Sequence, residues 1–155
     1  MEREARAHDD APLIGALLRI CWQAVRARIQ RDLTSDGFDD LGAAHLAVFQ
    51  YPSPRGVRVT ALADRAGMSR QAIAYLIREL EGKGYLERRP DPSDGRASLV
   101  HLTARGEAAV RTIRASVKGL EQEWESELGS TRFAQFRGTL LALTGALPDS
   151  NGAGR

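Results

Sequence analysis

Apolar residues recur three or four positions apart near the N-terminus, a spacing that places them on one face of a helix. This helix is expected over residues 11–33, and its apolar stripe consists of Ile14, Leu18, Cys21, Val25 and Ile29. Residues 34–37 have the composition of a loop. A second, shorter helix is expected over residues 42–50, where Pro52 and Pro54 end it because proline disfavours a helix in the residue before it.

Two further amphipathic helices are expected in the C-terminal part of the chain. The first begins at Thr103 and carries an apolar stripe of Val110, Ile113, Val117, Leu120, Trp124 and Leu128. Gly129 interrupts it, and the next stripe consists of Phe133, Phe136, Leu140, Leu143 and Leu147. Such stripes need an apolar partner, either in an intramolecular bundle or in a second copy of the chain. Because the long helices lie at the two ends of the chain, around a lobe too small to cover them, we expect a two-fold dimer.

The pattern between these ends is typical of two short helices that cross over a tight turn. Gly67 can end the first helix, residues 61–66, in a left-handed conformation, and Ser69 can cap the second. Thr60 is expected to cap the first helix, with a short strand before it at residues 57–59. The inward positions of the second helix are Ile73, Leu76 and Leu80, and the outward ones are Arg70, Gln71, Ala74, Tyr75 and Arg78. A polar outward face on such a helix is how proteins enter the DNA major groove.

A β-hairpin is expected to follow this second helix. Residues 85–89 and 98–102 read as strands, joined by the polar, turn-rich segment 90–95. The fold class is therefore mainly α with a small β-wing, in which a winged helix-turn-helix lobe is combined with N- and C-terminal helices that form a dimerisation region. The expected boundaries are 1–40 for the N-terminal helix, 41–102 for the DNA-binding lobe, 103–148 for the C-terminal helices and 149–155 for a disordered tail.

Composition and charge narrow the function further. The 155 residues have a formal net charge of only +2, but residues 55–96 contain nine Lys or Arg and six Asp or Glu, a modest basic excess on the lobe expected to bind DNA. No apolar stretch is long enough to span a membrane, and the charged N-terminus lacks the apolar core of a signal peptide, so a cytoplasmic location is expected. Cys21 is the single cysteine. With no catalytic motif or metal-ligand cluster, neither an enzyme nor a cofactor is expected.

The hairpin carries a more specific signal. The sequence LEGKGYLERR at residues 80–89 precedes DPSDGRASLVHLTARG at residues 91–106. With the flanking helices, this segment resembles the multiple antibiotic resistance regulator (MarR) family of winged helix-turn-helix transcription factors over roughly residues 13–147. The family's wing signature is matched by Asp94, Arg96, Leu102, Thr103 and Gly106.

The resemblance implies a triangular homodimer that binds double-stranded DNA, with Arg96 entering the minor groove and Asp94 orienting Arg96 or its turn. Arg70, Gln71 and Tyr75 match positions that face bases or phosphates, while Arg78, Arg88 and Arg89 suit phosphate contacts. Ala74 and Tyr75 depart from the basic or small hydroxyl residues common in the family. The expected DNA contacts are Ser69, Arg70, Gln71, Tyr75, Arg78, Arg88, Asp94 and Arg96.

The family resemblance also implies a regulated DNA affinity, with repression of a palindromic operator as the expected mode. A small, often aromatic effector would enter a cleft lined by Trp22, Arg26, His45 and Phe49, although core packing of these residues is the simpler interpretation. Cys21 could instead sense oxidants, but its place on an apolar stripe favours a buried thiol. A winged helix that binds a protein partner is the third alternative, which a steep salt dependence of DNA binding would exclude.

Overall fold

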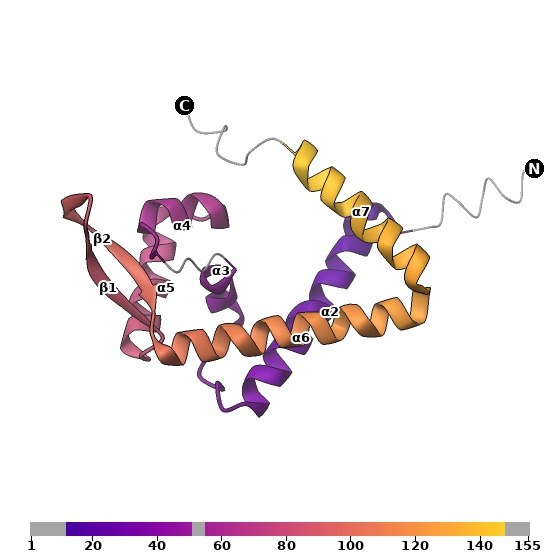
Figure 1. The fold of residues 1–155 in the computed structure, drawn as a ribbon, viewed down its shortest axis with the longest axis horizontal. Coiled ribbons are helices and arrows are strands. Elements are labelled where there is room, and N and C mark those ends of the chain that lie inside the picture. Colours follow the sequence, from indigo (N-terminus) through magenta and orange to yellow (C-terminus); the bar gives the residue numbers. More distant parts are fainter. Residues whose placement is uncertain (1–11, 51–54, 148–155) are drawn as a thin grey trace, which may run out of the picture.

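The computed structural model describes residues 12–50 and 55–147. It consists of a helical lobe that carries a β-hairpin and of a helical arm that extends to the opposite side (Figure 1). Its elements are α2 (Ile14–Ser35), the 3-10 helix η1 (Ala43–His45), α3 (Leu46–Phe49), α4 (Val59–Ala66), α5 (Arg70–Gly82), β1 (Leu86–Asp91), β2 (Asp94–Leu102), α6 (Ala104–Leu128) and α7 (Ser130–Ala146). None of these helices is long and apolar enough to cross a membrane in the part of the chain described.

The expected helix-turn-helix is present as α4 and α5. Gly67 ends α4 with a φ of 61°, in the left-handed region that glycine tolerates. The Ser69 hydroxyl oxygen then accepts a hydrogen bond from the Ala72 backbone N–H at 3.1 Å, which caps α5. Ala63 is buried where the two helices approach each other. The inward residues of α5 lie in the core, namely Ile73, Leu76, Ile77 and Leu80.

The start of α4 differs from the expected one. The helix begins at Val59 rather than residue 61, so Thr60 lies inside it and Arg58 takes the capping position without a side-chain cap. Of the expected strand, only Val57 pairs with the sheet, through a bridge to Val100 with N···O distances of 2.9 and 3.0 Å. The strand prediction for residues 57–59 was therefore wrong beyond Val57, because Arg58 already turns the chain into the helix.

Two other expected helices have different bounds. The first, α2, begins at Ile14 and ends at Ser35, and the start expected at residue 11 lies outside the described residues. The helix expected over 42–50 is split into η1 and α3, because the His45 side chain accepts the Gly42 N–H at 2.9 Å and closes a tight first turn. Pro52, Pro54 and the tail at 149–155 also lie outside the described residues.

The wing is a two-stranded antiparallel hairpin with a shorter connection than expected. Leu86 pairs with Leu102 at its base and Asp91 with Asp94 at its end, so that only Pro92 and Ser93 form the turn. The Asp91 carboxylate accepts hydrogen bonds from the Ser93 N–H at 2.8 Å and the Ser93 hydroxyl at 2.6 Å, which stabilises this tight turn. Arg96 lies on β2 between Asp94 and Ser98, in a stretch without a paired residue on β1 because the register shifts there.

The long helix α6 begins beneath the wing, crosses α2 and leads to α7 at the far end of the arm (Figure 1). At the crossing, the Arg28 guanidinium contacts Asp32 at 2.8 Å on its own helix and Glu123 at 2.7 Å on α6. The apolar face of α6 packs within the chain, with Val110 and Leu120 buried. Much of this stripe is therefore covered within the chain, as in the intramolecular bundle that the sequence left open as an alternative to a dimer.

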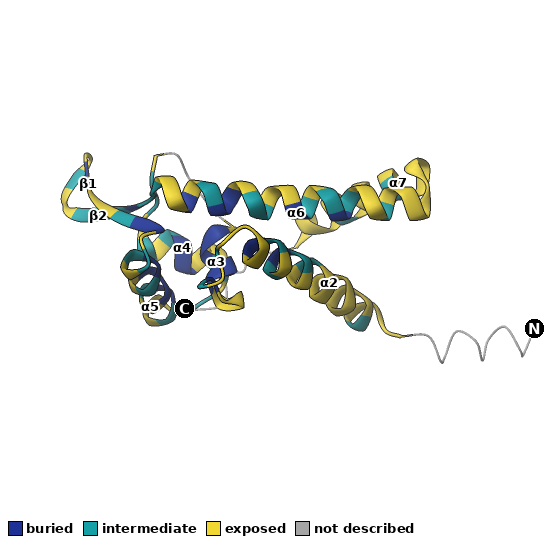
Figure 2. Ribbon diagram, turned by 90° about the horizontal axis from the view of Figure 1, so that it is seen from below, coloured by how far each residue is buried: buried dark blue, intermediate teal, exposed yellow. Residues whose placement is uncertain are grey.

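The rest of the arm has no such cover among the described residues. In Figure 2 the first half of α2 and nearly all of α7 are exposed, and α7 has no buried residue. Large apolar side chains lie open there; on α2 these include Ile14, Leu17, Leu18 and Ile20, and on α7 they include Phe136, Leu141 and Leu143. We name the exposed apolar faces of these two helices the arm face. A surface of this kind is typical of an interface with another protein.

Candidate DNA interface

The outward side of α5 has the properties of a reading helix. Arg70, Gln71, Tyr75 and Arg78 are exposed on it, and Ala74 is half-buried. Neither Arg70 nor Arg78 forms an ion pair within residues 12–50 and 55–147. Both guanidinium groups are therefore available to phosphates or bases. Ser69 is exposed beside them, with its oxygen engaged in the helix cap.

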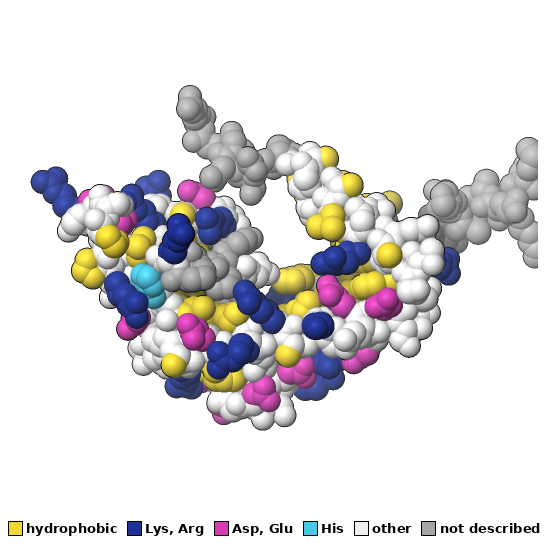
Figure 3. All heavy atoms as spheres, viewed as in Figure 1, with side chains coloured by type: hydrophobic (Ala, Val, Ile, Leu, Met, Phe, Trp, Pro, Cys, Tyr) yellow, Lys and Arg dark blue, Asp and Glu magenta, His cyan; other side chains and the backbone are white. Residues whose placement is uncertain are grey.

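The wing presents a third unpaired guanidinium, that of Arg96. Its side chain is exposed and forms no hydrogen bond or ion pair with the residues that the structure describes. Its backbone N–H donates to Asp94 Oδ1 at 3.1 Å. Asp94 therefore holds the main chain of Arg96 and does not contact its guanidinium. In Figure 3, several Lys and Arg side chains lie on the side of the molecule that carries the wing and α4, and others are spread over the rest of this face among acidic side chains.

Two other arginines of the hairpin are already engaged within the lobe. The Arg88 Nε atom donates to Glu81 Oε1 at 2.8 Å, and Arg89 pairs with Glu87. Both pairs are solvent-exposed and hence weak. A phosphate could displace them, but Arg88 and Arg89 are less free than Arg96.

An ion pair between Arg58 and Asp91 was not predicted from the sequence. Arg58 Nε and Nη2 donate to Asp91 Oδ2 at 2.9 and 2.6 Å, and Asp91 is only 6% exposed. The Ser93 hydroxyl and backbone N–H, followed by Arg58, lower the pKa of Asp91 to about 2. The two residues are 33 positions apart, so no local pattern could have revealed the contact.

A polar cluster at the other end of the lobe was also missed. The buried Tyr85 hydroxyl donates to Asp40 Oδ1 at 2.5 Å, and Arg105 contacts Asp40 Oδ2 at 3.1 Å while its guanidinium lies 4.4 Å from the centre of the Tyr85 ring. Burial, followed by the bond to Asp40, raises the pKa of Tyr85 to about 12. This cluster joins the loop after α2, the base of the wing and the start of α6.

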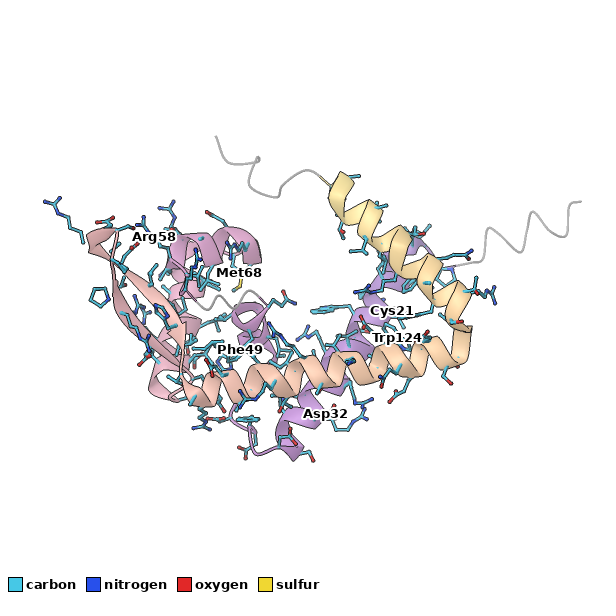
Figure 4. The ribbon with its side chains drawn as sticks, in the orientation of Figure 1. Cys21, Asp32, Phe49, Arg58, Met68 and Trp124 are labelled. Atoms are coloured by element: carbon cyan, nitrogen blue, oxygen red, sulfur yellow. The ribbon has the colours of Figure 1, made fainter. Side chains whose placement is uncertain are left out.

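The residues expected to line an effector cleft do not come together. Trp22 and Arg26 line a groove of about 270 Å³ with α3 and Met68. His45 does not line this groove: its side chain is buried, accepts the Gly42 N–H and lies 3.4 Å from Glu79 Oε2. Phe49 lies in the core and borders a different groove, against α6 (Figure 4). The expected set is thus reduced to Trp22 and Arg26.

Cys21 is exposed, contrary to the buried thiol expected from its place on the apolar stripe. It lies on the first half of α2, which the other described residues leave largely exposed (Figures 2 and 4). Its role as an oxidant sensor stays a prediction. Within residues 12–50 and 55–147, no three His, Cys, Asp or Glu side chains are grouped so as to hold a metal ion.

Comparisons with known proteins agree with this geometry. Residues 43–97 match the sequence model of the MarR family. A transcriptional regulatory protein for the hcr operon of Thauera aromatica is 31% identical over 88 residues, which are 57% of this chain and 51% of that protein. The chain thus spans about half the length of the curated relatives it matches.

Two solved structures are similar over most of the chain. CouR from Rhodococcus jostii RHA1, bound to p-coumaroyl-CoA, has a TM-score of 0.68 at 26% identity, covering 87% of this chain and 94% of CouR. A MarR family protein of Mycobacterium tuberculosis, in complex with salicylic acid, has a TM-score of 0.62 at 26% identity, covering 87% of this chain and 98% of that one. The likeness therefore extends from the winged lobe into the arm.

Proposed function

Because this chain belongs to the MarR family of transcriptional regulators, we propose that it binds operator DNA as a homodimer in the cytoplasm and represses transcription. The operator is a palindrome, read by one winged lobe of each copy. The lobe at residues 41–102 binds DNA, and the helices at 1–40 and 103–148 form the dimer. The observation that carries this proposal is a set of three exposed guanidinium groups on α5 and the wing, those of Arg70, Arg78 and Arg96, which form no ion pair with the residues that the structure describes.

The roles within this interface follow from chemistry. Gln71 can bond adenine and Arg70 guanine in the major groove, because each presents two groups to a base edge. Arg78 suits a phosphate. Arg96, on a narrow hairpin, suits the minor groove, where negative potential is greatest if the groove is narrow. In a two-fold dimer the two α5 helices must lie about 34 Å apart to enter successive major grooves.

Operator binding and its dependence on Arg96 can be tested together. We expect fluorescence anisotropy to detect tight binding to a selected palindrome, with an affinity that falls steeply with salt because phosphate contacts release counterions. The Arg96→Ala variant should bind about 1–3 kcal/mol more weakly. Arg89→Ala removes the same charge from the same hairpin, but from a residue paired with Glu87, and should therefore reduce operator affinity less than Arg96→Ala does. Equal losses would refute a specific role for Arg96, and weak, salt-insensitive binding by the wild type would favour a protein-binding module instead.

The groove beside Trp22 is the proposed effector site, since it combines an aromatic ring with a free cation and borders Met68, the residue before the cap of α5. Arg26 forms no ion pair within residues 12–50 and 55–147 and would bind an acidic ligand. A ligand that prefers a dimer with misplaced α5 helices weakens DNA binding by its difference in affinity for the two states.

We expect salicylate or p-coumaroyl-CoA to release the operator from the wild type, and Arg26→Ala to raise the required ligand concentration about tenfold by removing a charge-assisted contact. Titrating each ligand into the protein–DNA complex provides the measurement. Arg31→Ala, which removes an exposed charge further along α2, is the control. Identical release curves for the two variants would exclude this groove as the effector site.

A further inference from the structure

The wing is tied to the first turn of α4 by a side-chain contact near the hairpin turn. Arg58 occupies the capping position of α4, and its guanidinium lies against the hairpin where β1 ends (Figure 4). Both Nε and Nη2 donate to Asp91 Oδ2, and Nη2 is also 3.7 Å from Asp94 Oδ2. One guanidinium therefore contacts the last residue of β1 and the first residue of β2.

These contacts continue to Arg96 through the turn. Asp91 Oδ1 accepts the N–H and the hydroxyl of Ser93, and Asp94 Oδ1 accepts the N–H of Arg96. Each of the two carboxylates thus uses one oxygen toward Arg58 and the other toward the turn. A carboxylate as buried as that of Asp91 stays charged only because four donor groups compensate its lost hydration.

The hairpin has one other hydrogen-bonded connection to the start of α4 within the described residues. Val57 and Val100 exchange two backbone hydrogen bonds, four residues from Arg96 along β2. The base of the hairpin is also held by the buried Leu86 and by the Arg88–Glu81 pair to α5, but none of these contacts reaches the turn. The Arg58–Asp91 contact is a second, separate point of attachment nearer the turn, and two points fix a direction.

We propose that the Arg58–Asp91 ion pair positions the wing so that the Arg96 guanidinium reaches the minor groove. Arg58 and Asp91 are positioning residues and contact no DNA in this role. The inference rests on the proposed DNA-binding function. It adds that DNA binding depends on a contact between the wing and α4, away from the residues that would touch DNA. Charge-assisted hydrogen bonds are stronger than neutral ones, and here two of them reach one oxygen of a carboxylate whose other oxygen is bound by the Ser93 turn.

The sign of a charge change separates this role from simple electrostatics. Asp91 is an anion on the lobe that would approach phosphates, so neutralising it should strengthen DNA binding if it only repels them. If Asp91 instead positions the wing through Arg58, neutralising it should weaken DNA binding. Arg58 is itself 46% exposed at its side chain and could contact a phosphate directly. In that case, losing Asp91 would free Arg58 and again strengthen binding.

The decisive variant is Asp91→Asn, which keeps the size of the side chain and an acceptor for Ser93 but removes the charge that binds Arg58. We expect its operator affinity to fall about tenfold, within the range that loss of a specific arginine contact produces. Asp64→Asn is the matched control, because Asp64 is an exposed carboxylate on α4 without an ion pair among the described residues. It should bind DNA as tightly as the wild type or slightly more tightly. An affinity for Asp91→Asn that is unchanged or increased would overturn the proposal.

Two further measurements distinguish positioning from general loss of structure. Arg96→Ala should reduce operator affinity by a smaller factor in the Asp91→Asn background than in the wild type, because a misplaced Arg96 already contributes less to DNA binding. Equal costs would contradict the proposal. Hydrogen exchange without DNA should show faster exchange at the Ser93 and Arg96 amides in Asp91→Asn, with the amides of α5 unchanged. If the wild type binds no operator, the proposed function fails, while the exchange data still show whether this pair holds the wing.

Discussion

Replacing Gly106 with alanine is expected to destabilise the folded protein by about 3 kcal/mol, at the upper end of overpacking substitutions. A Cβ atom at this position would lie 2.1 Å from the Tyr85 carbonyl oxygen and 3.1 Å from Leu102 Cδ2. The carbonyl cannot move aside cheaply, because it accepts the Thr103 N–H at 3.0 Å and belongs to a residue whose side chain is fully buried. The start of α6 must therefore shift away from the lobe.

Urea denaturation followed by circular dichroism measures this loss. Gly82→Ala is the control, since Gly82 is exposed on α5, does not have a positive φ and has no neighbouring atom within 4 Å of the place that a methyl group would take. This substitution should be neutral or stabilise the protein, because alanine favours a helix more than glycine does. A Gly106→Ala variant as stable as the wild type would mean that α6 is not held against Tyr85.

The helix-turn-helix was predicted well because its determinants are local. Gly67 and Ser69 act within a few residues of themselves, through a left-handed backbone and a helix cap, and the inward spacing of α5 is a property of that helix alone. Thr103 belongs to the same class: its hydroxyl oxygen accepts the Gly106 N–H at 3.1 Å and caps α6, which begins one residue after the expected start at Thr103. The sequence pattern contains all the information these features need.

The contacts that place the elements relative to one another could not be predicted. The Arg58–Asp91 and Asp40–Tyr85 contacts join residues 33 and 45 positions apart, and the charges themselves do not specify their partners. The length of the wing turn was overestimated for a related reason. Proline, serine and glycine indicated a loop, whereas the Asp91 carboxylate holds the segment as a two-residue turn.

Periodicity also identifies an apolar face without saying what covers it. The stripes of α6 and α7 look alike in the sequence, yet Leu120 is 9% exposed and Leu143 is 45% exposed. The first packs within its own chain, and the second faces solvent in this single copy. A charged residue at Val117 or Leu120, the positions at which the sequence suggested a dimer contact, would therefore disrupt the fold of one chain before it tested any interface.

The arm face is the surface on which to test dimerisation. Leu17 on α2 and Leu143 on α7 are 47% and 45% exposed, so glutamate at either position should leave the chain folded. If a second copy covers them, each glutamate is buried without a partner, which costs at least about 3 kcal/mol and raises the dimer Kd by about 100-fold or more. We expect sedimentation velocity to show a dimer for the wild type and a monomer for Leu17→Glu/Leu143→Glu, with unchanged circular dichroism.

Gln135→Glu supplies the matched control, because it adds the same charge to α7 on the side away from its apolar stripe and should remain dimeric. A double variant with the mass of the wild type would refute the arm face as the interface. Dissociation should also weaken operator binding far more than the loss of one base contact does. A monomer brings a single reading helix to the palindrome, whereas in the dimer the first helix to bind holds the second close to its half-site, where its effective concentration is high. The apolar face of the arm and the exposed arginines of the lobe lie at opposite sides of the molecule (Figure 1), yet both are required for the same binding event.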